Sequence, residues 1–149
     1  LMRAFTVYHN RALFFHKDLS ILNLYGKNTI LIHMYIEKKD AEGFSIPGGT
    51  TGRLYPTHPN NEQTVALVET DGVYPEKGFA INDVCTETIV MLEGEFCIEY
   101  NGEEYILRPG DVLMILPKHP YRISGKGKAC VCITPGWDSA QNHIITSNI

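Results

Sequence analysis

Short β-branched runs closed by turn residues follow one another through the second half of the chain, and this spacing constrains the fold most. Residues 86–93 (TETIVMLE) end at Gly94, and residues 95–100 (EFCIEY) end at Asn101-Gly102. Asn-Gly is a strong hairpin signal, because both central positions of a type I′ turn need positive φ. The pattern predicts an antiparallel meander rather than strands that alternate with helices.

The same pattern continues toward the C-terminus. Pro109-Gly110-Asp111 predicts another turn, and residues 111–116 (DVLMIL) form a nearly continuous apolar run. Such a run predicts a short strand buried on both faces. Residues 121–124 and 129–134 predict two further strands, separated by a turn at Gly125-Lys126-Gly127. Turns every six to ten residues favour a β-sandwich or barrel.

The first half of the chain has fewer clear strands. Residues 29–37 (TILIHMYIE) alternate in the period-2 pattern of a strand, and residues 63–70 predict a second one. Residues 43–61 are rich in Gly, Pro, Thr and Asn and have no sustained periodicity. A loop of this length inside a compact domain usually carries function or contains unrecognised strands.

Length and composition limit the class of protein. The 149 residues are 44% hydrophobic and 20% charged, with a net charge of −4, which predicts one ordinary globular domain. No basic run indicates a nucleic-acid partner, and no apolar stretch is long enough to cross a membrane. Four cysteines lack zinc-site spacing and are interpreted as reduced thiols of a cytoplasmic protein: Cys85, Cys97, Cys130 and Cys132.

Residues 80–95 (AINDVCTETIVMLEGE) resemble the first motif of the cupin superfamily, in which H-x-H, four residues, a glutamate, six residues and a glycine follow one another. Glu87 and Gly94 fit that spacing. Residues 102–122 (GEEYILRPGDVLMILPKHPYR) resemble the second motif. The resemblance implies an all-β, mostly antiparallel jelly-roll barrel, the cupin-type double-stranded β-helix. It implies a single cupin-like domain over residues 1–149, with N-terminal strands and a loop over about 1–62, a barrel core over about 63–134 and a tail over 135–149.

In metal-binding cupins, two histidines and the glutamate of the first motif join a histidine of the second around a divalent ion. Carried over by position, these ligands fall on Ala80, Asn82, Glu87 and Tyr121. Only Glu87 keeps a side chain that suits such an ion. The resemblance therefore implies a cupin without the conventional metal site, and we expect no metal and no other cofactor.

A non-standard metal site remains as an alternative. Cys85 lies two residues before Glu87 and can share its strand face, and His119 could complete a set of three ligands. Single ligands at irregular spacing rarely assemble a tight site. We therefore prefer to interpret Cys85 as a small core residue.

The ligand positions of the resemblance still indicate a pocket. We predict that Asn82, Glu87, His119, Tyr121 and Trp137 bind an unknown, sugar-like small metabolite. As an alternative, the protein is a metal-independent sugar or carbonyl isomerase or epimerase. Burial would then raise the pKa of Glu87 for acid–base work, with Tyr121 or His119 as its proton partner. An equally weighted interpretation is that Glu87 only stabilises the barrel.

The expected partners also follow from the resemblance. Cupin-like domains of this size often pair through their N-terminal strands, and residues 29–37 have apolar side chains on both faces. We therefore expect a homodimer, with a small metabolite as ligand and neither nucleic acid nor membrane as partner.

Overall fold

The computed structural model describes residues 20–24, 27–31, 35–55 and 62–146. The chain divides into two compact units, Leu1–Tyr35 and Ile36–Ile149, which are described separately. In the first unit, β1 (Ser20–Leu24) and β2 (Lys27–Leu31) form an antiparallel pair.

The strand predicted over residues 29–37 is only partly described. Residues 29–31 belong to β2, and residues 35–37 are not in a strand. Residues 32–34 lie outside the described part of the chain. The homodimer expected through this segment stays a prediction, as does the assignment of all 149 residues to one domain.

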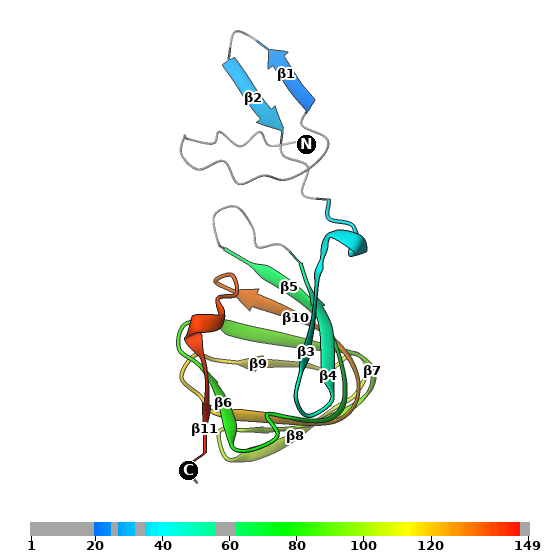
Figure 1. The fold of residues 1–149 in the computed structure, drawn as a ribbon, viewed down its shortest axis with the longest axis vertical. Coiled ribbons are helices and arrows are strands. Elements are labelled where there is room, and N and C mark those ends of the chain that lie inside the picture. The colour runs from blue at the N-terminus through cyan, green and yellow to red at the C-terminus, as the bar shows by residue number, and fades with distance from the viewer. Residues whose placement is uncertain (1–19, 25–26, 32–34, 56–61, 147–149) are drawn as a thin grey trace. The chain divides into compact units, whose positions relative to one another are not determined.

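The second unit is one antiparallel sheet that curls around a central space (Figure 1). Its strands are β3 (Glu42–Ile46), β4 (Thr50–Leu54), β5 (Thr64–Tyr74), β6 (Phe79–Asn82), β7 (Thr86–Tyr100), β8 (Glu103–Leu107), β9 (Val112–Ile115), β10 (Tyr121–Thr134) and β11 (Asn142–Ile145). Neighbouring strands follow the order β11-β6-β10-β5-β4-β3, and β7 pairs with β10, β8 and β9. Two single turns of 3-10 helix, η1 (Lys38–Asp40) and η2 (Ser139–Gln141), flank the strands.

The two longest strands, β7 and β10, pair with each other along their whole length. The turn predicted at residues 125–127 is wrong, because β10 passes through it without interruption. Gly127 faces Gly94 of β7, where φ is 77°, and a register shift follows at Lys128/Ala129. Glycines and a bulge let both strands bend sharply and stay paired, so one pair forms a corner of the barrel.

The hairpin at Asn101-Gly102 is confirmed. Both residues have positive φ, 54° and 82°, and β7 pairs with β8 on either side of them. The burial predicted for residues 111–116 is wrong for one face of the strand. Ile115 is fully buried, whereas Val112 and Met114 are 54% and 58% exposed. Strand β9 pairs only with β7. Val112 and Met114 point away from the buried Ile115, so this face of the strand lies on the outer surface of the barrel.

Residues 43–61 contain two strands that sequence periodicity did not reveal. β3 and β4 form a hairpin through Gly48 and Gly49, whose φ values are 97° and 88°. β4 then pairs with β5, so the hairpin extends the sheet over the interior. Residues 56–61 lie outside the described part of the chain.

The core consists of inward-facing side chains from nearly every strand. On β7, residues 87, 89 and 91 are buried and alternate with partly exposed neighbours, as expected for a strand with one face inside. Among the described residues, no helix is long and apolar enough to span a membrane. The core cluster is Ala66, Ala80, Cys85, Ile89, Met91, Phe96, Ile98, Leu107, Ile115, Tyr121, Ala129, Val131 and Ile133.

Candidate functional site: a cavity around Glu87

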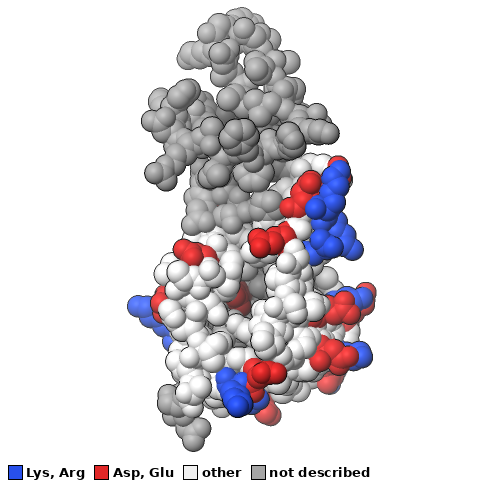
Figure 2. All heavy atoms as spheres, viewed as in Figure 1, with Lys and Arg blue, Asp and Glu red and all other residues white. Residues whose placement is uncertain are grey.

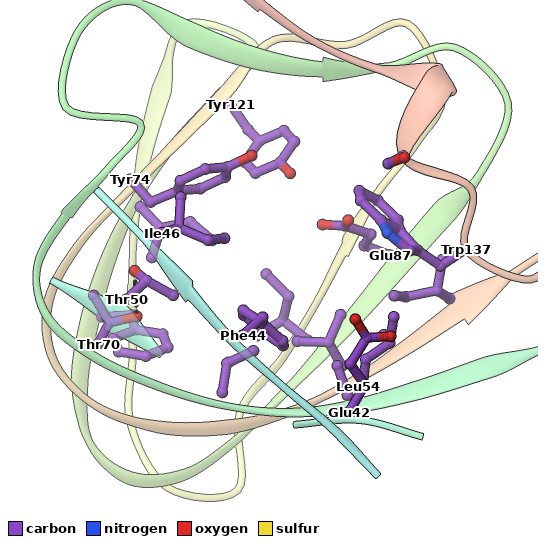
Figure 3. Close-up of a pocket in the computed structure, with 18 of the residues that line it drawn as sticks. Glu42, Phe44, Ile46, Thr50, Leu54, Thr70, Tyr74, Glu87, Tyr121 and Trp137 are labelled. Atoms are coloured by element: carbon purple, nitrogen blue, oxygen red, sulfur yellow. Dashed lines mark hydrogen bonds between the residues drawn. The ribbon is translucent and has the colours of Figure 1, made fainter. Parts of the chain in front are cut away.

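The barrel encloses a cavity of about 680 Å³ that opens to the surface (Figures 2 and 3). Its walls come from β3, β4, β5, β7 and β10 and from the segment after β10. Most of the lining side chains are aliphatic or aromatic. A cavity of this kind with a few inward-facing polar groups is the usual form of a small-molecule site.

Glu87 carries a buried carboxyl group into the cavity, whereas the other acidic lining residues, Glu42 and Asp138, are exposed. The Glu87 side chain is only 8% exposed, and its carboxylate points into the open space in Figure 3. Burial raises the pKa of Glu87, and hydrogen bonding from Asn82 and Tyr121 offsets only part of that rise. The neutral carboxylic acid is therefore favoured relative to an exposed glutamate, and it can both donate and accept a hydrogen bond.

Tyr121 lies beside Glu87 and is 2% exposed. Burial and the nearby negative charge of Glu87 raise the pKa of Tyr121, so its hydroxyl stays protonated. The ring of Tyr74 packs 6.3 Å from that of Tyr121, centroid to centroid. The Tyr74 hydroxyl donates to Asn142 Oδ1 at 3.2 Å, which anchors it to the C-terminal strand.

Asn82 supports Glu87 from behind. It is fully buried and is not among the residues that line the cavity. Asn142 Nδ2 donates to Asn82 Oδ1 at 2.8 Å, across the pairing of β11 with β6. The Asn82 side chain lowers the pKa of Glu87, although its Nδ2 makes no hydrogen bond of standard geometry. Asn82 is thus placed to orient Glu87 rather than to contact a ligand.

Trp137 lines the cavity. In Figure 3 its side chain and the Glu87 carboxylate border the same cavity. The Trp137 backbone N–H donates to Thr64 Oγ1 at 2.9 Å, which ties the segment after β10 to the start of β5. The tryptophan is therefore held by its backbone, with the ring free to pack against a ligand.

His119 lies elsewhere. Its Nδ1 is 2.9 Å from the Pro117 carbonyl oxygen, and its ring packs on Tyr100 with centroids 5.8 Å apart. It is not among the residues that line the cavity. The structure thus brings Glu87, Tyr121 and Trp137 to one space, places Asn82 behind them and leaves His119 outside.

Cys85 belongs to the polar layer behind Glu87. Gln141 Nε2 donates to Cys85 Sγ at 3.0 Å, and Gln141 Oε1 accepts from the backbone N–H of Cys85 at 3.3 Å. Burial and the charge of Glu87 raise the pKa of Cys85 to about 11, so it remains a thiol near neutrality. Within the described ranges, no group of three or more His, Cys, Asp or Glu side chains could hold a metal ion. Cys85, Glu87 and His119 do not form such a group.

Several lining residues were not predicted from the sequence. Phe44 and Glu42 lie on β3, Tyr74 ends β5, and Asp138 follows Trp137. The alternation of Phe44 and Ile46 before a Pro-Gly-Gly turn is the signal that could have identified β3. Nothing local to Tyr74 distinguishes it from other strand tyrosines.

The chain was compared with known proteins. No protein-family profile matches it, and no curated protein matches its sequence. Solved structures do match. Pac13, described as a unique nucleoside dehydratase, aligns with a TM-score of 0.69 and 14% identity, over 77% of this chain and 92% of its own. An RmlC-like cupin from Shewanella frigidimarina aligns at 0.60 and 16%, over 73% and 96%. The fold is that of the cupins.

A third match is KdgF from Halomonas sp., with a TM-score of 0.60 and 15% identity, over 73% of this chain and 99% of its own. The predicted all-β cupin fold is confirmed. Variants of Streptomyces PAC13 have been solved with uridine, so one protein of this fold takes up a small metabolite. At these identities the likeness establishes fold alone, and the cupin fold hosts unrelated functions. The function of this protein has to be argued from its own cavity.

Proposed function

We propose that this cupin domain binds a small organic metabolite in the cavity around Glu87. The observation that carries the proposal is a buried carboxyl group that opens into an otherwise mainly apolar cavity of metabolite size. Ligand cavities commonly measure about 300–1,000 Å³ and combine apolar walls with a few polar groups. A cavity of about 680 Å³ is large enough for a ligand the size of a nucleoside or monosaccharide.

Each polar residue has a role in this proposal. Glu87 and Tyr121 hydrogen-bond the polar end of the ligand, since both line the cavity, and burial raises the pKa of each. Tyr74 and Trp137 supply aromatic walls, and Asn82 orients Glu87. The uridine held by Streptomyces PAC13 supports a ligand of this size, although it leaves the chemical identity open.

The proposal is tested by a thermal-shift screen of metabolites. A ligand at about 100 times its Kd stabilises the native state by about 2.7 kcal/mol, which raises the melting temperature by several degrees. Val68→Phe places a large ring in the cavity and should abolish the shift, because Val68 lines it. Leu67→Phe is the matched control, since Leu67 is the neighbouring residue on β5 and is exposed outside. Equal shifts in both variants would place binding elsewhere.

Proton transfer is a second candidate function, of the isomerase or epimerase type on a sugar or carbonyl compound. The close approach of Glu87 to the Tyr121 hydroxyl favours it, because burial raises the pKa of the carboxyl toward the range of a useful acid or base. Glu87→Gln keeps the shape and removes the titrating group. It should lower any turnover by about 10²–10⁴-fold while ligand binding persists. Unchanged turnover would remove Glu87 from the mechanism.

A further inference from the structure

The charged residues that line the cavity all have the same sign. They are Glu42, Glu87 and Asp138, and no Lys, Arg or His occurs among the described residues of the lining. Figure 2 shows acidic atoms within the central hollow, with no basic atoms beside them there. The cavity therefore presents negative potential to whatever enters it.

Carboxylates on the outer surface are arranged differently. Glu93 pairs with Lys128, Glu95 with Arg108 and Asp71 with Lys126. Within the described part of the chain, neither Glu42 nor Glu87 makes an ion pair, and Asp138 accepts only the backbone N–H of Ala140 at 2.9 Å. Within the described residues, the lining carboxylates thus lack the cationic partners that Glu93, Glu95 and Asp71 have.

The groups around Glu87 supply no positive charge. Tyr74 from β5 and Tyr121 from β10 keep their protons, as does the thiol of Cys85, and Asn82 from β6 is neutral. Glu87 is more than nine-tenths buried and points into the cavity. A buried carboxylate is stable only with a cationic or hydrogen-bonding partner. Asn82 and Tyr121 hydrogen-bond the Glu87 carboxyl but bring no charge, so a cationic ligand that enters the cavity can supply the opposite charge.

Aromatic rings form much of the remaining wall, from Phe44, Tyr74, Phe96, Tyr121 and Trp137. The face of an aromatic ring carries negative electrostatic potential and attracts an ammonium group within about 6 Å. Tryptophan gives the strongest such contact of the aromatic residues, and Trp137 lines the same cavity as Glu87. Aromatic faces and unpaired carboxylates favour the same kind of ligand.

We propose that the ligand of this cavity is a small organic cation, an amine or ammonium compound with an apolar body. Its charged group lies between Glu87 and Trp137, and its apolar part contacts the aliphatic wall. This inference rests on the proposed binding function and deepens it. Phosphorylated sugars, nucleotides and carboxylic acids are disfavoured, because Glu42 and Asp138 would repel them and no basic residue of the described lining would pair with them.

The test uses three probes of similar size that differ in charge: phenethylamine, phenethyl alcohol and phenylacetate. Binding is measured by titration calorimetry with the full chain at low and moderate salt. The amine should bind at least about tenfold more tightly than the alcohol, and phenylacetate most weakly, with the amine's advantage smaller at higher salt. An alcohol that binds as tightly as the amine, or a carboxylate that binds as tightly as the alcohol, would overturn the proposal.

Two variants at exposed lining positions sharpen the test. Glu42→Gln and Asp138→Asn should each weaken amine binding about two- to fivefold and leave alcohol binding unchanged. Asn at position 138 keeps an oxygen that can accept the Ala140 N–H. The control is Glu69→Gln, which removes a carboxylate from the outer face of β5. An equal effect of Glu69→Gln would show a long-range charge effect and contradict a cation site in the cavity.

The outcomes also separate this inference from the proposed function. If phenethyl alcohol or an uncharged metabolite binds, Val68→Phe abolishes that binding and the amine has no advantage, the cavity is a binding site and the cationic ligand is refuted. If neither a charged nor an uncharged compound binds in the probe set and the metabolite screen, the proposed function itself fails.

Discussion

The interior of this barrel has two regions that are built from the same strands and packed differently. The packed region includes Met91 and Ile98 of β7, Leu107 of β8 and Ile115 of β9, all buried and none of them lining the cavity. The cavity region is built from Glu87 and Ile89 of β7 and from residues of β10, β5 and the β3–β4 hairpin. One strand thus contributes to a filled core and to an open site. The difference indicates that stability resides mainly in the first region and binding in the second.

The largest expected effect is a difference between two isoleucines on β7. Ile98→Ala should lower the free energy of unfolding by about 2–5 kcal/mol, because it leaves a void among close-packed neighbours. Ile89→Ala should cost clearly less, since Ile89 already borders open space on one side. Urea denaturation of both variants measures the difference. Equal losses would mean that the cavity wall is packed as tightly as the core.

The next effect concerns the polar layer that joins the C-terminal strand to the site. Asn142→Ala removes the hydrogen bonds to Asn82 and from Tyr74 and should destabilise the fold by about 1–3 kcal/mol. The substitution should also weaken ligand binding, because Asn82, which orients Glu87, then loses its hydrogen bond from Asn142. His143→Ala is the control on the neighbouring residue. His143 pairs with Asp83 at the exposed surface, so its loss should cost at most about 1 kcal/mol.

The smallest effect is a pH dependence carried by Glu87. Because its pKa is raised on folding, its stabilising contribution is present below the ordinary glutamate pKa and is lost as pH rises through the folded-state pKa. Glu87→Gln should therefore gain stability relative to wild type as pH increases from 4 toward 8. Parallel unfolding curves at these two pH values measure the trend. A stability difference that is independent of pH would contradict a raised pKa of Glu87.

Local sequence determined the features that depend on neighbouring residues. The hairpin at Asn101-Gly102 forms because both positions tolerate positive φ, and Glu87 faces inward because strand side chains alternate. The motif spacing also pointed to Glu87 and Tyr121, which the structure brings to one cavity. These inferences needed only short-range geometry and a resemblance in spacing.

Other features depend on contacts between distant segments, and only the tertiary structure decided them. β10 passes through a Gly-Lys-Gly segment as one strand because β5 and β7 pair with it on both sides. Residues 42–54 form a hairpin because β5 offers an edge for pairing. Long-range pairing thus overrode local turn propensity, and it also determined which carboxylates line the cavity. That arrangement of charge, and the ligand class inferred from it, follows from the assembled barrel rather than from any single segment of the sequence.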